Sequence, residues 1–397
     1  MKRTLFFLTL SMWLIGCTPL DSIDIEDVWY RVLDENYVDF SMAGRFDPAL
    51  GDRSKYFFFV DKSLLIRVTA IEYETVLPDN KTPVIASGVL YHPLNKKSRG
   101  VFDLMPTARL GAGAAGSEML YAIEGVLAFK GYTIVMPDFI GSGSSDHLPM
   151  PFLMVENTGR VAYDMRRAAA KYLWDKYRYT FPVETRIMGY SLGGAAALAT
   201  QKYYEKHHAN TIKVKEVFTG SGVYDLPVAF EAFAKSGISE FVAIPSAIYG
   251  LNHYYNLNLD FTKIFTGNLI SKNGHLKEDW LFGPHRLSAP GLTYELGREV
   301  RNYMHPDFFK SMEEQKGTEF EKLHQAFMEN SISEGWRPKA PINMIHARLD
   351  ACVPVECTET AVKKLRKAGA NISFMIYPGN HVSVGILYFL RLILSFI

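Results

Sequence analysis

The amino-acid sequence predicts an α/β fold: a mostly parallel central sheet with helices on both faces, interrupted by one helical insertion. Two observations support this. Short apolar runs typical of buried strands alternate with helical patterns from residue 64 to residue 225, and the alternation resumes at residue 342. Between these stretches, residues 226–340 lack the alternation and are rich in aromatic side chains. Strands that alternate with helices form parallel sheets, because each crossover lays a helix over one face.

The composition excludes several classes of protein. Of the 397 residues, 48% are hydrophobic and 21% are charged, which fits neither a disordered chain nor a polytopic membrane protein. The formal net charge is +1, so we do not expect nucleic acid as a partner. Three cysteines are too few for a disulfide scaffold.

The N-terminal residues have the order of an export signal. Lys2 and Arg3 precede the short apolar stretch Leu5–Ile15, which is too short to remain as a membrane-spanning helix. The stretch ends in Leu-Ile-Gly-Cys, which resembles a bacterial lipobox and implies cleavage before Cys17 and lipidation of that cysteine. We therefore expect residues 1–16 to be a signal peptide. Cys17 would then anchor the mature chain in the cell envelope, at the outer rather than the inner membrane. The alternatives are an ordinary signal peptide and a buried helix with a chance cysteine.

The elements before the insertion follow from apolar periodicity. We expect a lipid-anchor linker and N-terminal extension over 17–60, with a short helix around Ile25–Val38, and the first part of the core over 61–225. The expected strands are Leu64–Val76, Val84–Tyr91, Gly100–Met105, Tyr132–Met136, Thr185–Met188 and Val214–Thr219. The expected helices are Ser117–Lys130, Thr158–Tyr177 and Gly193–Glu205.

Residues 226–340 are predicted to form a helical cap. Their aromatic side chains form either an apolar substrate site or the core of the cap itself. The second part of the core, 341–397, contains the expected strands Ile342–His346 and Ile372–Tyr377, the helix Thr360–Ala368 and a C-terminal helix. The apolar run Val384–Ile397 is well short of a membrane span, so we expect it to pack on the sheet.

A serine lies in a strand-to-helix turn. Gly189-Tyr190-Ser191-Leu192-Gly193 fits G-x-S-x-G, with an apolar strand before it and an alanine-rich helix after it. Such a turn brings chain segments very close, so its flanking positions require glycine, and it lifts the serine hydroxyl above the sheet. We predict Ser191 as a nucleophile and the Leu192 N–H as an oxyanion donor. A glycine-rich turn with an inert serine is the alternative.

An acid and a base follow in the order that this type of site requires. A serine hydroxyl needs a base, and the base needs an acid to orient it. Asp350 comes just after the strand Ile342–His346, and His381 comes just after the strand Ile372–Tyr377. We predict Asp350 as the acid and His381 as the base, with Glu356 as the fallback acid. His346 lies within its strand and is expected to pack there.

The second oxyanion donor should come from the loop after the strand Gly100–Met105. Pro106 has no N–H, so Thr107 or Ala108 must donate, and we choose Thr107.

The same loop contains a pattern that resembles a dinucleotide site. Gly111, Gly113 and Gly116 match G-x-G-x-x-G, but Pro106–Leu110 separate the first glycine from the strand. We therefore expect a flexible loop above the active site, with Asp138 capping a turn beside Gly141 and Gly143.

Taken together, these residues resemble an α/β-hydrolase, and more narrowly the secretory lipase family, the lipase-A type with a large lid. The resemblance covers about Ile71 to His381 and rests on Asp138 with Gly141-Ser142-Gly143-Ser144, Asp164–Ala168, the serine turn, Asp350 with Val353-Pro354, and Gly379-Asn380-His381. It implies hydrolysis of carboxylic esters by Ser191, Asp350 and His381, beneath a lid over 226–340. Relatives often carry His-Gly-Thr where this chain has Met105-Pro106-Thr107.

We therefore expect a serine hydrolase that cleaves a lipid or small-molecule ester through an acyl-enzyme, with no cofactor or metal. A serine peptidase or amidase of the same fold and a non-catalytic binding protein are the alternatives.

Cys352 and Cys357 flank the acid loop. They could form a disulfide there or remain as two free thiols. The natural ester and the oligomeric state also stay open.

Overall fold

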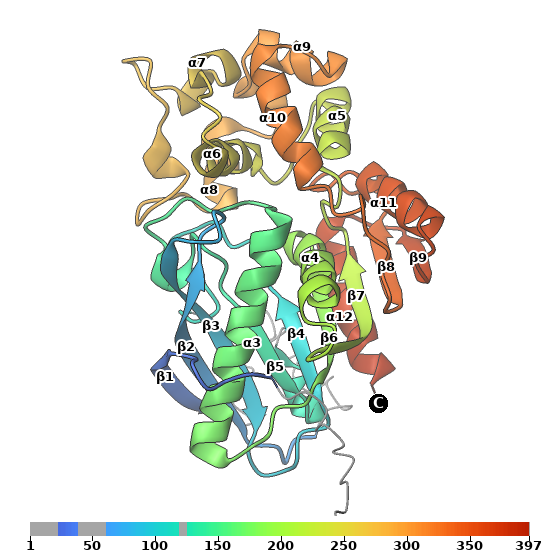
Figure 1. Ribbon diagram of the computed structural model, residues 1–397. Helices are drawn as coiled ribbons and strands as arrows, with labels where there is room; N and C mark the ends of the chain where they lie inside the picture. Colours follow the sequence, from blue (N-terminus) through green and yellow to red (C-terminus); the bar gives the residue numbers. More distant parts are fainter. Residues whose placement is uncertain (1–22, 39–60, 119–124, 397) are drawn as a thin grey trace, which may run out of the picture.

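The computed structural model of the chain describes residues 23–38, 61–118 and 125–396 (Figure 1). The described residues contain a nine-stranded sheet in the order β1-β2-β3-β5-β4-β6-β7-β8-β9. The six strands β5, β4, β6, β7, β8 and β9 run parallel to one another. β1, β2 and β3 form an antiparallel extension, in which β3 pairs with β5. Their bounds are β1 Tyr30–Val38, β2 Ile66–Val76, β3 Pro83–Pro93, β4 Val101–Met105, β5 Thr133–Pro137, β6 Glu184–Tyr190, β7 Lys213–Gly220, β8 Ile342–Ala347 and β9 Ile372–Tyr377.

The helix predicted around Ile25–Val38 is wrong. Tyr30–Val38 forms the edge strand β1, which pairs with β2 from Tyr30 opposite Tyr73 to Val38 opposite Ile66. The apolar residues of this segment follow a helical spacing, but the pairing satisfies the backbone groups along the open edge of β2. Tertiary pairing therefore overrides the local pattern.

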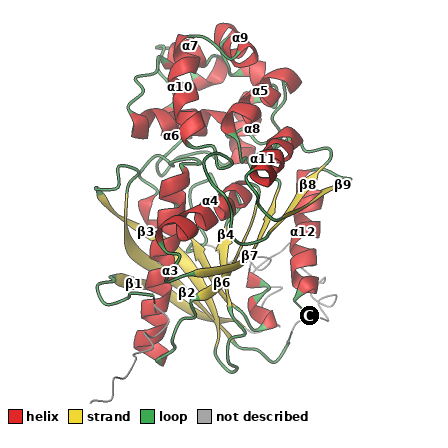
Figure 2. Cartoon of the chain, turned by 45° about the vertical axis from the view of Figure 1, so that its right-hand side comes forward, coloured by secondary structure: helices red, strands yellow, loops and turns green. Residues whose placement is uncertain are grey.

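Helices cover both faces of the sheet (Figure 2). One face packs against α3 (Val155–Tyr177), α4 (Leu192–His207) and α11 (Val355–Lys367), and the other against α12 (His381–Ser395). The two faces alternate along each strand: in β6, Ile187 packs in the α4 core and Met188 in the α12 core. The C-terminal helix thus packs on the sheet, as predicted. Of the helix expected over Ser117–Lys130, residues 119–124 lie outside the described residues, and the end, Ala128–Lys130, is a 3-10 helix.

A buried ion pair fixes α3 to the sheet. The Arg166 guanidinium lies 3.0 Å from the Asp103 carboxylate on β4, and both side chains are almost wholly buried. Thr185 donates to the same carboxylate, and Arg166 donates to the Pro182 carbonyl. Because either charge alone would be left unpaired in the interior, the two side chains depend on each other.

The chain between β7 and β8 forms a layer of helices above the carboxyl ends of the parallel strands (Figure 1). These are α5 Leu226–Ser236, α6 Ile244–Tyr255, α7 Phe261–Ile264, α8 Ala289–Leu296, α9 Pro306–Glu314 and α10 Thr318–Glu329. We call this layer the cap. Its buried aromatics include Phe265, Phe308, Phe320 and Phe327, which pack in a core that continues into α4. None of the helices in the described ranges is both long enough and apolar enough to cross a membrane.

His92 on β3 makes the stability of the fold depend on pH. Its ring is buried against Tyr179, its Nδ1 lies 2.8 Å from the Thr133 hydroxyl, and burial lowers its pKa to about 4. An unfolded histidine has a pKa of about 6.5, so between these values the unfolded chain binds a proton that the native chain does not.

We therefore expect the free energy of unfolding to rise between pH 4 and pH 6.5, with His92 contributing up to about 1.4 kcal/mol per pH unit. Denaturant titrations of wild type and His92→Gln at several pH values would measure this slope, which should be shallower in the variant. The exposed His275 supplies the matched control, His275→Gln. Equal slopes in all three proteins would contradict the prediction.

Candidate active site

Ser191 occupies a sharp turn between β6 and α4. Its φ is 60° and its ψ is −127°, a conformation in which a residue other than glycine is strained. A Cβ on Gly189 would lie 2.0 Å from the Gly193 carbonyl oxygen, and one on Gly193 would lie 2.2 Å from that of Met105. Glycine is therefore required on both sides of the serine, as the sequence pattern indicates.

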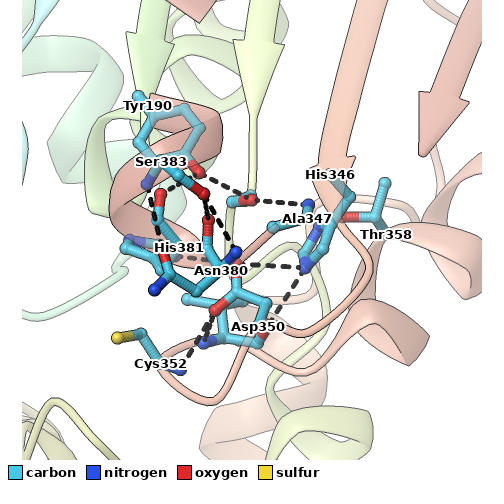
Figure 3. Close-up of polar contacts among 11 residues, drawn as sticks. Tyr190, His346, Ala347, Asp350, Cys352, Thr358, Asn380, His381 and Ser383 are labelled. Atoms are coloured by element: carbon cyan, nitrogen blue, oxygen red, sulfur yellow. Dashed lines mark hydrogen bonds and ion pairs between the residues drawn. The ribbon is translucent and has the colours of Figure 1, made fainter. Parts of the chain in front are cut away.

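Asp350 and His381 meet beside this turn, from the loops after β8 and β9 (Figure 3). His381 Nδ1 lies 2.7 Å from Asp350 Oδ2. The other carboxylate oxygen accepts hydrogen bonds from the backbone N–H groups of Cys352 and Val353, at 3.0 and 2.8 Å. The Asp350 side chain is fully buried, whereas 13% of the His381 side chain is exposed.

The environment keeps Asp350 charged. Burial by itself would raise the pKa of this carboxyl, but the hydrogen bond and charge of His381 and the Val353 N–H outweigh it, so the pKa lies below its usual value. The carboxylate can therefore orient the His381 ring and stabilise it when it gains a proton.

His346 supports the acid loop from within β8. The ring is completely buried, and its Nε2 donates to the Val353 carbonyl at 3.0 Å while its Nδ1 accepts from the Thr358 hydroxyl at 2.6 Å. Its Nε2 is also 3.5 Å from Asp350 Oδ2. Burial lowers the pKa of His346 despite this carboxylate, so the ring stays neutral. As predicted, it packs within its strand.

Tyr190, the residue before Ser191, connects the serine turn to His381. The sequence analysis did not predict this contact. Its hydroxyl donates to the His381 carbonyl at 2.6 Å, and the two rings lie 5.1 Å apart (Figure 3). The Tyr190 oxygen accepts from Ser221 after β7, which in turn accepts from the Ala347 N–H at the end of β8. The only signal in the sequence is a hydroxyl-bearing aromatic inside G-x-S-x-G.

The two predicted oxyanion donors carry backbone amides without partners in the described part of the chain. Leu192 is the first residue of α4, so its N–H has no carbonyl one turn before it. Thr107 follows Pro106, whose carbonyl lies next to Gly193 in the serine turn. Both amides are therefore available for a ligand.

The structure brings together Asp350 and His381, but Ser191 forms no hydrogen bond with His381 among the described residues. Such bonds between nucleophile and base are often long before substrate binds.

Glu356, the fallback acid, is exposed in the first turn of α11. Cys352 and Cys357 are both free thiols, so the structure contains the second of the two states that the sequence left open.

The G-x-G-x-x-G loop is held by an acid. The buried Asp138 accepts hydrogen bonds from the N–H of Gly116, at 2.7 Å, and of Ser117, and Ser87 donates to its second oxygen. A dinucleotide site would offer these amides to phosphate. Here a carboxylate already occupies them, which disfavours a phosphate ligand.

Asp350, Cys352 and His381 place three possible metal ligands within 4.8 Å of one another. However, both Asp350 oxygens already accept hydrogen bonds, and burial raises the pKa of the Cys352 thiol to about 12. A protonated thiol is a poor ligand. The set therefore suits proton transfer better than metal binding.

The chain is similar to known proteins in sequence and in fold. Residues 109–384 match the secretory lipase family, whereas a search of curated proteins gives no match. A Legionella pneumophila protein has a similar structure, with 19% identity, a TM-score of 0.77, and coverage of 93% of this chain and 96% of that one.

Two further structures are similar. One is the rice cell wall degrading esterase LipA from Xanthomonas oryzae, with 20% identity, a TM-score of 0.72, and coverage of 92% of this chain and 96% of that one. The other is Candida antarctica lipase A in its closed state, with 16% identity, a TM-score of 0.64, and coverage of 90% of this chain and 78% of that one. These likenesses confirm the predicted α/β-hydrolase fold, and the family match, which covers more than half of the sequence, supports an ester hydrolase. The chain belongs to the secretory lipase family.

Proposed function

We propose that this protein is a serine esterase that hydrolyses carboxylic esters through an acyl-enzyme on Ser191. The observation that supports this most directly is the 2.7 Å hydrogen bond between a buried, charged Asp350 and His381, next to a strained serine turn. Family membership favours an ester over an amide as the substrate. Two alternatives remain: a serine peptidase or amidase that uses the same residues, and a binding protein that has these residues but catalyses no reaction.

In this mechanism His381 is the general base. Asp350 holds the Nδ1–H of the ring, which leaves Nε2 to take the proton of the Ser191 hydroxyl as it attacks the acyl carbon. The imidazolium that forms is stabilised by the charged carboxylate. It then protonates the departing alcohol, and the neutral ring afterwards activates a water molecule that hydrolyses the acyl-enzyme.

The developing oxyanion would be stabilised by backbone donors. The Leu192 N–H at the N-terminus of α4 is one, and the Thr107 N–H is the second. Where relatives often carry His-Gly, this chain has Met105-Pro106. Both carbonyls pack against Gly193, so the loop that carries the Thr107 N–H lies beside the serine turn.

Replacing the nucleophile should abolish turnover. We expect Ser191→Ala to lower kcat for p-nitrophenyl butyrate by about 10³-fold or more, and to prevent labelling by a fluorophosphonate. Ser373→Ala, on an exposed position of β9, is the matched control and should behave as wild type.

Three other results would point elsewhere. Equal rates for Ser191→Ala and wild type would refute the assignment of the nucleophile. Ser191-dependent turnover of an anilide but no ester would indicate an amidase. A wild-type chain that neither turns over nor takes the label would indicate a binding protein.

Tyr190 is proposed as a positioning residue for the base. In Tyr190→Phe the His381 carbonyl loses its hydrogen bond, so the ring is held less firmly opposite Ser191. We expect kcat to fall about 10- to 100-fold with little change in KM, since small displacements at a reacting group have effects of this size.

Steady-state kinetics and the rate of fluorophosphonate labelling would measure this, and both should fall together. Tyr294→Phe, whose side chain is 89% exposed, is the matched control. A variant that loses thermal stability but keeps the wild-type kcat would mean that the Tyr190 hydroxyl is merely structural.

We also propose that the protein is exported and anchored by lipid at Cys17, with the outer membrane as its site. The basic residues, apolar stretch and lipobox support this, and Cys17 lies outside the described residues. In a bacterial host, Cys17→Ser should abolish labelling by radioactive palmitate and release the protein from the membrane fraction, whereas Cys352→Ser should do neither. Labelling that persists in Cys17→Ser would contradict the anchor.

A further inference from the structure

An apolar cavity of about 50 Å³ lies beside Ser191. The cap contributes Phe230 and Phe233 from α5 and Ala247 from α6, and the core contributes Val353. Apart from the Ser191 hydroxyl and the protonated Cys352 thiol, its lining side chains are hydrocarbon. A cavity of this character next to the nucleophile suits the acyl part of an ester.

The walls of this cavity are held by packing. The Phe230 side chain is 2% exposed, and its ring lies 4.4 Å from that of Phe327 on α10. Phe233 and Ala247 are also buried. Side chains packed in this way resist displacement, so the volume reflects the folded site.

The volume suits a small group. A cavity of about 150 Å³ holds benzene, and one water needs about 10–15 Å³. The space beside Ser191 therefore holds an acyl chain of about two to four carbons.

A second, mostly apolar cavity of about 20 Å³ shares part of its lining with the first. Phe152, Leu153 and Leu192 line both cavities and so form the wall between them, whereas Ile332 lines only the second. Leu153 has a φ of 60°, a conformation that is strained for leucine. The turn is held by the Phe152 N–H donating to Met150 and the Met154 N–H donating to Pro151.

We propose that the cavity beside Ser191 is the acyl site, that it accepts short acyl esters of about two to four carbons, and that Leu153 sets this limit by closing off the second cavity. The proposal rests on the serine esterase function above. In this proposal Leu153 is a specificity residue, because it contacts the end of the acyl chain and does not contact the reacting atoms.

The test compares p-nitrophenyl acetate, butyrate, hexanoate and octanoate as substrates of the full chain in detergent. Wild type should have its highest kcat/KM at acetate or butyrate and at least about a tenfold lower value at octanoate, since each misfit methylene costs about tenfold or more. Leu153→Gly should raise the octanoate-to-butyrate ratio about tenfold or more, because it joins the two cavities and glycine adopts the φ of residue 153 without strain.

Two further variants make the test specific. Ile332→Ala enlarges the second cavity but leaves the wall intact, so its ratio should equal that of wild type. Ala247→Val adds volume to the lining of the acyl site from the cap and should shift the preference from butyrate to acetate, a result that does not depend on how Leu153→Gly folds.

The outcomes separate this proposal from the proposed function. A wild-type preference for octanoate that is lost in Ser191→Ala would overturn the short acyl site and leave the serine esterase standing. A ratio that stays unchanged in folded Leu153→Gly would overturn the role of Leu153. Turnover of every ester by Ser191→Ala would instead overturn the serine esterase itself.

Discussion

The site depends on one close approach of backbone to backbone. Gly189, Gly193 and the end of β4 lie so near one another that a single Cβ on either glycine would overlap a carbonyl oxygen. This contact sets the start of α4, the strained angles of Ser191 and the position of the loop after Met105. The proposed nucleophile and both proposed oxyanion donors therefore derive their positions from the same packed turn.

Around that turn, hydrogen bonds join loops that are distant in sequence. Ala347, Ser221, Tyr190 and His381 form a chain that links the ends of β8, β7 and β6 to the start of α12. His346 fixes the acid loop in the same way through Val353. Because these bonds lie in a buried region, they hold Asp350 and His381 in place before a substrate arrives, which is what the proposed mechanism requires for electrostatic stabilisation of charge.

The sequence predicts those parts of the structure that depend on local pattern. The parallel strands follow from short apolar runs. Ser191 follows from the glycine motif around it, and Asp350 and His381 follow from their order in the chain and their places just after strands. β1 does not, because its pairing with β2 is tertiary and its apolar spacing resembles a helix. The contact of Tyr190 with His381 also could not be predicted, since the two residues meet only in the folded chain. The positive φ of Leu153 could not be predicted either, because leucine rarely adopts it and no local motif marks it.

The carboxylate of Asp225 links the base of the cap to the core. Asp225 precedes α5, and its buried side chain accepts from Ser333, which follows α10, and pairs with Lys364 of α11 at 2.6 Å. The entry and the exit of the cap are therefore held together, beside the helix that follows the acid loop. α5 begins from this tie and supplies Phe230 and Phe233 to the cavity beside Ser191. These two side chains of the acyl site proposed above therefore belong to the part of the cap that is held to the core, whereas Leu153, the residue proposed to limit acyl length, belongs to the core itself.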